Sequence, residues 1–236
     1  NKEKLSNLIS ELSKIKDIKR IRYTTSHPKD FTEDLIQEHG YNKKKLMPLI
    51  HLPVQSGSNK ILRAMNRKHT IQDYLEIIEK LKAVNPNIKF SSDFIIGYPG
   101  ETDNDFNDTL KLLKKIEFVN CFSFIFSPRP GTPAAKLAEV DYRISKKRLV
   151  IFQNIANEIK LRYRKSLFNK SAPVLFENKI KGKDEFFGRD EYSNSVIVKT
   201  KENLKGRIKE VKITGGNQNT LFGEIDQKLD KRNFAA

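Results

Sequence analysis

Residues 49–58 read LIHLPVQSGS, an apolar run typical of a β-strand that ends abruptly in Gln55, Ser56 and Gly57. The apolar residues favour a buried strand, whereas the polar and glycine residues after them favour a turn with accessible side chains. Both the fold and the function of this chain depend on what such a strand end holds.

Three further segments have strand character, and helical periodicity separates them. The strand-like segments are 21–25 (IRYTT), 88–96 and 121–127 (CFSFIFS). Apolar residues at helical spacing predict helices over 5–15, from Thr32 to Gln37, and after the capping pairs Thr70–Asp73 and Thr102–Asp105. The alternation predicts right-handed βαβ units and a parallel sheet, so that all four strands end at one edge.

Ligands of α/β proteins bind at that edge, so the residues that follow each strand form one candidate site. All of them are polar, charged, glycine or turn-forming residues. They are Thr25, Ser26 and His27; Gln55, Ser56 and Gly57; Asp93 within the third strand and 97–101 after it; and Ser127, Pro128 and Arg129.

The last third of the chain has a different pattern. One long helix is predicted from Ile144 to Leu167, and residues 142–165 carry eight Lys and Arg. This basic face is suited to RNA phosphates, and it is equally consistent with a solvated helix surface. Beyond a boundary near Asn169, short strands separated by glycines predict a small antiparallel barrel. They are 174–177, 186–189, 194–199, 206–213 and 220–225.

Composition narrows the classes of function. The net charge of +16, from 45 Lys and Arg against 29 Asp and Glu, favours a polyanionic partner, although a chain rich in solvated lysines is the alternative. Cys121 is the only cysteine, which excludes a disulfide framework and a metal site built from cysteines. No apolar run approaches the length that crosses a bilayer, so we expect a cytoplasmic protein without membrane contacts. Because Asn1 is not an initiator Met, we expect the chain to belong to something longer.

Five motifs together resemble the radical S-adenosylmethionine methylthiotransferases, and the stretch TTSHP resembles their MiaB type. The resemblance implies an α/β fold, with part of a radical SAM (β/α) barrel over 1–168, an OB-like TRAM barrel over 169–229 and a tail over 230–236. The motifs are IRYTTSHP at 21–28, HLPVQSGS at 51–58, MNRKHT at 65–70, SSDFIIGYPGET at 91–102 and SPRPGTPAA at 127–135.

The same resemblance implies a set of cofactor-binding residues: Gln55, Ser56, Arg67, Asp93 and Arg129. Gln55 would contact the ribose of S-adenosylmethionine, Arg67 its methionine carboxylate, and Asp93 the ribose hydroxyls, as their hydrogen-bonding groups allow. Alternatives remain for each: Gln55 and Ser56 could cap the next helix, Arg67 could lie on the surface, and Asp93 could be structural. Arg129, between two prolines, could meet the cofactor, tRNA or solvent.

An expected motif is missing. Members of this family bind one [4Fe-4S] cluster through a C-x-x-x-C-x-x-C loop and a second through three N-terminal cysteines, and a single cysteine cannot replace them. The resemblance therefore implies that both cluster sites lie outside this chain, which by itself contains no catalytic and no metal-binding residue.

The activity implied for the intact protein is addition of a methylthio group to C2 of isopentenylated adenosine next to the anticodon of tRNA. The second cluster would supply the sulfur. We expect a monomer that binds the anticodon stem-loop and does not bind DNA. The alternatives are a non-catalytic RNA-binding protein and a sister methylthiotransferase that acts on threonylcarbamoyl-adenosine or a ribosomal protein.

Overall fold

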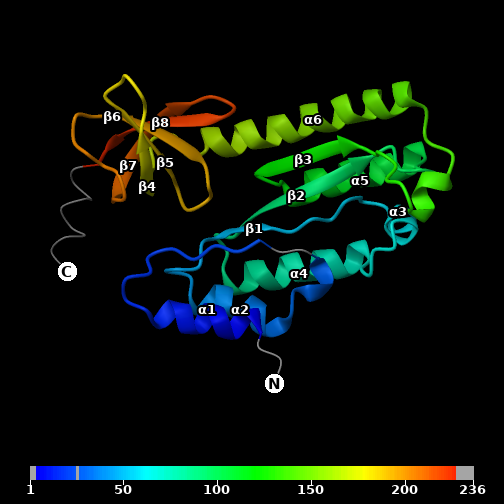
Figure 1. Cartoon of the computed structure of the whole chain (residues 1–236), viewed down its shortest axis with the longest axis horizontal. Coiled ribbons are helices and arrows are strands. Elements are labelled where there is room, and N and C mark those ends of the chain that lie inside the picture. Colours follow the sequence, from blue (N-terminus) through cyan, green and yellow to red (C-terminus); the bar gives the residue numbers. More distant parts are fainter. Residues whose placement is uncertain (1–3, 25–26, 227–236) are drawn as a thin grey trace. The chain divides into compact units, whose positions relative to one another are not determined.

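A computed structural model of the chain describes residues 4–24 and 27–226 (Figure 1). The chain divides into two compact units, Asn1–Ile159 and Lys160–Ala236, and each is described by itself. Within the described residues, every helix is too short or too polar to cross a bilayer.

The helices of the first unit follow the predicted alternation. Both predicted capping boxes are present: Thr70 and Asp73 begin α4, and Thr102 and Asp105 begin α5. Each Asp accepts hydrogen bonds from the backbone and hydroxyl of its Thr, which satisfies N–H groups that a helix start would leave unpaired. The helices are α1 (Leu5–Lys14), α2 (Glu33–Tyr41), α3 (Asn59–Ala64), α4 (Ile71–Val84), α5 (Asp103–Ile116) and α6 (Tyr142–Lys165), with 3-10 turns at Pro28–Asp30 and Pro133–Lys136.

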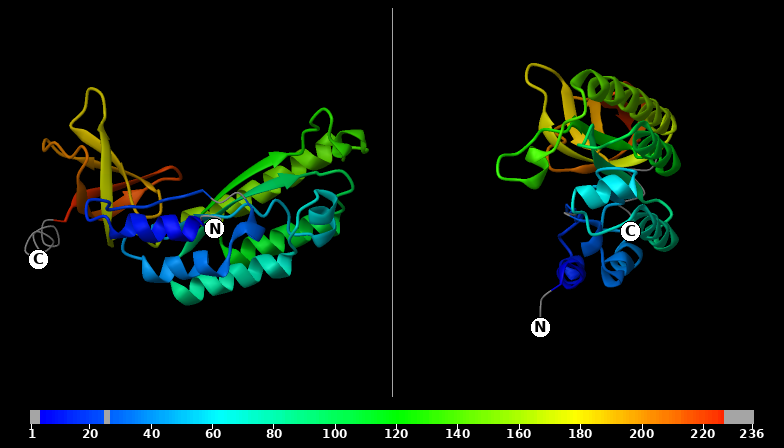
Figure 2. Two further views of the ribbon diagram at one scale, coloured as in Figure 1. Left: turned by 60° about the horizontal axis from the view of Figure 1, so that its bottom comes forward. Right: turned by 90° about the vertical axis from the view of Figure 1, so that its right-hand side faces the viewer.

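Three strands form a sheet in the order β1–β2–β3, and all of them run parallel, as the alternation predicts. They are β1 (Leu49–His51), β2 (Lys89–Ile96) and β3 (Asn120–Ile125). Strand β1 is shorter than the apolar run at 49–54 suggests because the hydroxyl of Ser92 replaces a backbone bond of the ladder. It donates to Leu52 O at 2.8 Å and accepts from Val54 N at 3.0 Å, and beyond it Gln55 pairs with Phe94 in a further bridge. Figures 1 and 2 show β2 and β3 side by side with their arrowheads pointing the same way.

The prediction of a fourth strand over 21–25 is wrong in extent for the residues that the structure describes. Ile21 forms a single parallel bridge with Leu46, and Thr25 lies outside the described residues. Tyr23 instead directs its hydroxyl to the ring of His39 in α2, at 2.6 Å from Nε2. Tyr23, one of the residues that suggested a strand, therefore packs against a helix.

The two faces of the sheet differ. On one face Phe94 is fully buried, with its ring centroid 4.7 Å from that of Phe152 in α6 and 5.6 Å from that of Phe118. On the other face Phe122 and Phe124 are 48% and 60% exposed. The core of the unit thus lies between the sheet and its helices, and the opposite face is open.

The second unit contains a closed five-stranded barrel in the order β4–β5–β6–β8–β7. Four of its five pairings are antiparallel, as predicted, while β6 and β8 run parallel. The barrel is filled by apolar residues such as Val174, Phe176 and Phe186. Its strands are β4 (Ser171–Lys179), β5 (Glu185–Arg189), β6 (Ser195–Lys199), β7 (Ile208–Gly216) and β8 (Thr220–Ile225).

Candidate cofactor-binding site

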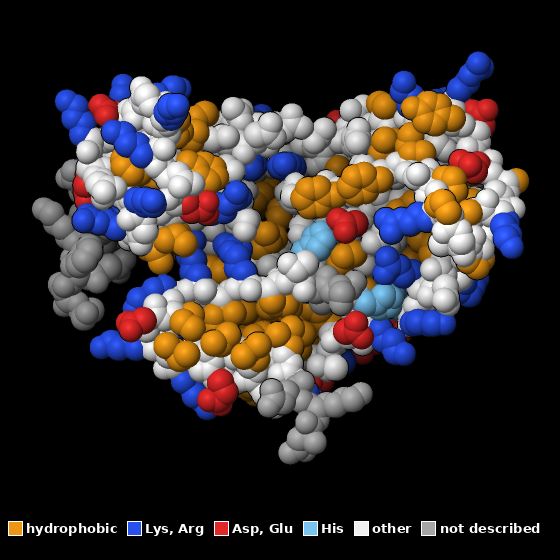
Figure 3. All heavy atoms as spheres, viewed as in Figure 1, with side chains coloured by type: hydrophobic (Ala, Val, Ile, Leu, Met, Phe, Trp, Pro, Cys, Tyr) orange, Lys and Arg blue, Asp and Glu red, His pale blue; other side chains and the backbone are white. Residues whose placement is uncertain are grey.

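The strand ends of the parallel sheet open into a cleft of about 720 Å³, a volume typical of small-molecule sites. Four of the five predicted cofactor-binding residues line it: Gln55, Arg67, Asp93 and Arg129. On the face shown in Figure 3, charged and histidine side chains gather beside exposed hydrophobic ones over the sheet. The other lining residues are Ala64, Met65, Asn66, Ile95, Tyr98, Phe124, Ile125, Phe126, Ser127, Thr132, Pro133 and Ala134.

Gln55 has a backbone conformation that side-chain-bearing residues rarely adopt, with φ at +74°. Neighbouring β2 holds it there, because Gln55 N donates to Asp93 O at 2.9 Å and Gln55 O accepts from Ile95 N at 3.0 Å. A left-handed residue other than glycine costs about 1–2 kcal/mol, and such strain gathers at binding sites. The conformation places a buried amide side chain on the cleft wall, where it can both donate and accept hydrogen bonds.

Asp93 is partly buried and has a partner, His51, which is not among the predicted site residues. Its Oδ2 lies 3.3 Å from Nε2 of His51, and Nδ1 of the same ring lies 3.0 Å from Oγ of Ser91. His51 is thereby fixed in orientation and holds one carboxylate oxygen of Asp93. The sequence did contain a signal for His51, because this residue begins the HLPVQSGS motif. In the sheet its register partner is Ser91, two residues before Asp93.

Arg67 follows α3 and is half-buried on the cleft wall. Burial lowers the pKa of its guanidinium, and the nearby negative charge of Asp93 raises it again. A guanidinium on the wall of a partly apolar cleft is suited to two parallel hydrogen bonds with a carboxylate. Arg67 and Asp93 therefore provide the cleft with one cationic and one anionic group for a zwitterionic or nucleoside ligand.

Tyr98 and Arg129 bring two loops to the same cleft. The hydroxyl of Tyr98 donates to Ala64 O at 2.9 Å, which ties the loop after β2 to the end of α3. Arg129 is exposed, and its carbonyl accepts hydrogen bonds from the backbone and hydroxyl of Thr132. Its loop is therefore held by its own turn, and its side chain stays accessible at the cleft.

Ser56, the fifth predicted residue, faces away from the cleft. Its hydroxyl is buried, lies 3.4 Å from Oγ1 of Thr109 in α5, and accepts from Ser58 N at 3.2 Å. Nor do Gln55 and Ser56 cap the next helix, because Ser58 is the N-cap of α3 and accepts from Ile61 N. The geometry gives Ser56 a positioning role in the turn.

The first predicted strand end is only partly described. Thr25 and Ser26 lie outside the described residues. The ring of His27 meets the buried ring of His69 edge-on, with their centroids 5.1 Å apart. Neither histidine lines the cleft.

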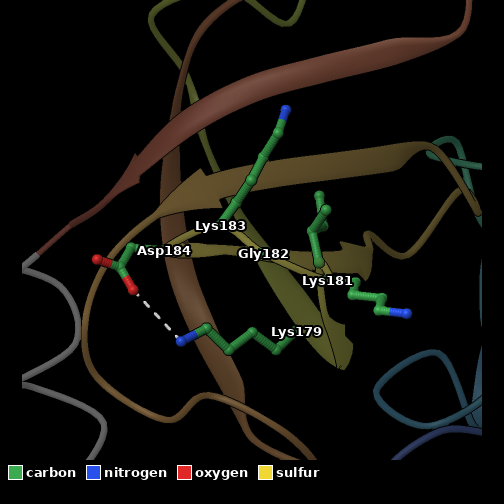
Figure 4. Close-up of a pocket in the computed structure, with 6 residues that line it drawn as sticks. Lys179, Lys181, Gly182, Lys183 and Asp184 are labelled. Atoms are coloured by element: carbon green, nitrogen blue, oxygen red, sulfur yellow. Dashed lines mark hydrogen bonds and ion pairs between the residues drawn. The ribbon is translucent and has the colours of Figure 1, made fainter.

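The barrel presents a second candidate surface at the β4–β5 hairpin (Figure 4). Lys179, Lys181 and Lys183 project from this turn, and Lys179 Nζ lies 3.3 Å from Oδ1 of Asp184. Two aromatic residues of β5 lie near this turn: Phe186 fills the core, whereas the ring of Phe187 is partly exposed, with the guanidinium of Arg189 5.2 Å from its centroid.

An iron–sulfur cluster does not fit the residues of this chain. Such clusters require several thiolates, and the sequence contains only Cys121, which lies on β3. Among the described residues there is also no group of three His, Cys, Asp or Glu that could hold a metal ion. The cleft, by contrast, offers the donors and acceptors that a nucleoside and an amino-acid carboxylate need.

Comparison with known proteins places both units in described families. Residues 2–113 match the Radical SAM superfamily, and residues 169–225 match the TRAM domain. The chain is 52% identical to the tRNA-2-methylthio-N(6)-dimethylallyladenosine synthase of Pelagibacter ubique, over 98% of this chain and 52% of that protein. It is 47% identical to the synthase of the same name from the Wolbachia of Culex pipiens, over 93% of this chain and 50% of that protein.

The chain thus spans about half the length of the curated relatives it matches. Among solved structures, a coproporphyrinogen III oxidase from Escherichia coli, described as a radical SAM enzyme, aligns with 70% of this chain and 45% of its own, at 13% identity and a TM-score of 0.47. Membership of the radical SAM superfamily implies S-adenosylmethionine and iron–sulfur chemistry in general. With both domains in order and about half of all residues shared with these relatives, the chain belongs to the radical S-adenosylmethionine methylthiotransferase family, MiaB type.

Proposed function

We propose that this chain is the cofactor- and tRNA-binding part of an enzyme that adds a methylthio group to C2 of N6-dimethylallyladenosine in tRNA. The observation that carries the proposal is the convergence of Gln55, Arg67 and Asp93 on one cleft at the carboxyl edge of a parallel sheet. The names of the relatives supply the substrate and the reaction.

The proposed roles of the cleft residues follow from their chemistry. Arg67 pairs with the methionine carboxylate of S-adenosylmethionine, Asp93 accepts hydrogen bonds from its ribose hydroxyls, and the amide of Gln55 bonds the ribose. His51 keeps Asp93 oriented, and Arg129 lies where it can meet either the cofactor or the substrate. Bound together with an iron–sulfur cluster, S-adenosylmethionine supplies the radical chemistry, while these residues bind and orient it.

We also propose the organisation of the whole protein. Residues 1–168 form part of the radical SAM barrel, 169–229 the TRAM barrel and 230–236 a tail. The ligands of two [4Fe-4S] clusters come from a segment outside this chain, one cluster supplying the sulfur, so that this chain alone does not catalyse the reaction. The protein acts in the cytoplasm as a monomer, contacts the anticodon stem-loop, and has no DNA or membrane partner.

The first test measures binding of S-adenosylmethionine by equilibrium dialysis, in the protein that also includes the cluster-binding segment. Arg67→Ala removes a charged hydrogen-bonding partner, which weakens binding by about 10–100-fold. Arg63→Ala is the matched control, because Arg63 is an exposed residue of α3 that does not line the cleft. Unchanged affinity in Arg67→Ala contradicts the assignment of Arg67.

A second measurement distinguishes an enzyme from an RNA-binding protein. Iron and acid-labile sulfide are measured per chain after anaerobic reconstitution, for this chain and for the longer protein. Uptake of iron and sulfide by the longer protein but not by this chain supports the proposal. If neither protein takes them up, the result favours the non-catalytic RNA-binding alternative. Mass spectrometry of modified nucleosides from a deletion strain separates the sister methylthiotransferases, because each leaves a different nucleoside unmodified.

A further inference from the structure

The excess of positive charge is concentrated in α6. Residues 142–165 contain eight Lys and Arg and a single acidic residue, Glu158, which is a net charge of +7 over one helix. The region that matches the TRAM domain, 169–225, contains eleven Lys and Arg against eight Asp and Glu, a net charge of only +3 over more than twice the length. The domain expected to bind RNA therefore has the lower density of positive charge.

Many basic side chains of the barrel are also neutralised locally. Lys179, Lys183, Arg189 and Arg207 each lie within 3.7 Å of a carboxylate oxygen of the barrel. A phosphate approaching these side chains would have to compete with carboxylates that are already in place. Exposed ion pairs of this kind are weak, but they reduce the charge that a polyanion meets.

Three of the four basic residues in the first half of α6 have no such partners; the fourth, Arg148, is buried and paired. Arg143, Lys146 and Lys147 are exposed, and among residues 4–24 and 27–226 their side chains take part in no ion pair or hydrogen bond. They recur at positions i, i+3 and i+4, so they share one face of the helix. We call these three residues the α6 basic face.

The opposite side of α6 is fixed to the first unit. Ser145, Arg148 and Phe152 are buried there, and the guanidinium of Arg148 bonds Glu101 and Asp103. The α6 basic face therefore lies on a rigid element, so less conformational entropy is lost when a partner binds. Tyr142, 65% exposed at the start of the helix, adds an aromatic surface of the kind on which bases stack.

We propose that the α6 basic face binds RNA phosphates, and that α6 supplies the main electrostatic contact of this chain with its RNA. The inference rests on the proposed tRNA substrate, and it assigns the contact to Arg143, Lys146 and Lys147 on the radical SAM side of the chain. Unpaired cationic side chains on a fixed helix face fit a regularly spaced row of phosphates, and each contact releases bound counterions.

The test uses the whole 236-residue chain and a fluorescein-labelled RNA hairpin with an anticodon stem-loop sequence. Binding is followed by fluorescence anisotropy at salt concentrations from about 50 to about 200 mM. The double variant K146Q/K147Q removes two charges from the α6 basic face. Its matched control is K43Q/K44Q, which removes two exposed charges after α2 that have no ion pair among the described residues.

We expect K146Q/K147Q to bind the hairpin about tenfold more weakly than the unaltered chain at about 0.1 M salt. The slope of log K against log salt decreases by about 1.4 if the contacted phosphates are single-stranded and by about 1.8 if they are paired. K43Q/K44Q keeps both the affinity and the slope. Circular dichroism and the melting temperature remain unchanged in both variants, because all four residues are exposed.

Four outcomes overturn the inference. If both double variants weaken binding equally, only the total charge matters. If neither variant changes the slope, or if the unaltered chain does not bind the hairpin, α6 holds no RNA. If K146Q/K147Q lowers binding to vesicles of anionic phospholipid but not to the hairpin, the partner of this face is a membrane. None of these results bears on the binding of S-adenosylmethionine, which tests the proposed function separately.

Discussion

Arg148 of α6 and Glu101, in the loop after β2, form an almost fully buried ion pair in which Nη1 lies 2.8 Å from Oε1. The side chains are 8% and 1% exposed. The same Oε1 accepts from Gly97 N at 3.2 Å, and Arg148 also donates to Glu101 O at 3.1 Å. Arg148 thereby fixes the loop that includes Tyr98, one of the residues on the cleft wall.

Removal of the arginine leaves a buried carboxylate without its cation. Burial already raises the pKa of Glu101, and Arg148 and the Gly97 amide counteract this. We expect Arg148→Met to lower the free energy of unfolding by about 3–5 kcal/mol, measured by urea denaturation. Arg207→Met is the control, because the Arg207–Glu202 pair is exposed and its loss costs about 1 kcal/mol or less.

The double variant Arg148→Met/Glu101→Leu separates the cost of an unpaired charge from lost packing. Replacement of both partners by apolar residues leaves no buried charge, so the double variant should be more stable than Arg148→Met alone. A double variant that is less stable than the single one would mean that packing around Arg148, including its contact with the ring of Phe106, accounts for the effect.

Two glycines of the same loop make a matched pair. Both have positive φ, +72° at Gly97 and +80° at Gly100, so alanine at either position carries the same left-handed strain. A Cβ on Gly97 would lie 2.2 Å from Oγ of Ser145, whereas a Cβ on Gly100 would meet nothing within 4 Å. We expect Gly97→Ala to lower the free energy of unfolding by about 1–3 kcal/mol more than Gly100→Ala does. If both variants lower the free energy of unfolding equally, the loop moves away from α6 without a cost in stability.

Local sequence signals predicted the elements that depend on neighbouring residues. The capping boxes at Thr70 and Thr102 begin helices as predicted, because each box is closed within four residues. The parallel direction of β1, β2 and β3 also follows from the alternation of strands and helices. These features need no knowledge of distant contacts.

Features that depend on distant contacts could not be predicted in the same way. Arg148 is 47 residues from Glu101, and nothing in its helical pattern distinguishes it from the exposed Lys146 and Lys147. Ser56 turns away from the cleft because its hydroxyl meets that of Thr109 in α5. Gln55 has a left-handed backbone because it pairs with β2. The cleft was predicted from the strand ends, and its supporting contacts were not.

Acid should destabilise the first unit through His39. This residue is 1% exposed, and burial lowers its pKa to about 4. The unfolded chain binds a proton near pH 6.5, so stability falls as the pH decreases from about 6.5 to about 4, by up to about 3 kcal/mol. Urea denaturation across this range measures the loss. In His39→Phe the free energy of unfolding should depend less on pH. The prediction is contradicted if NMR shows that the His39 ring titrates near its ordinary pKa.

The last turn of α6 should belong to the barrel. The sequence pattern changes near Asn169, but the compact unit begins at Lys160. Arg164, buried in that unit, donates through Nη1 to Asn217 O at 3.2 Å, and Leu167 and Phe168 pack against the barrel core. A barrel fragment that starts at Asn169 would expose this apolar surface and lose these bonds.

We therefore expect a fragment of residues 160–236 to unfold cooperatively. A fragment of residues 169–236 should be less stable by about 3–5 kcal/mol, since two large apolar side chains and a partly buried hydrogen bond are lost. Thermal denaturation followed by circular dichroism compares the two fragments. Leu167→Ala in the longer fragment is the control for packing, and it should account for about half of the difference. Equal melting temperatures of the two fragments would mean that the barrel closes without the helix, and that the boundary lies at Asn169 after all.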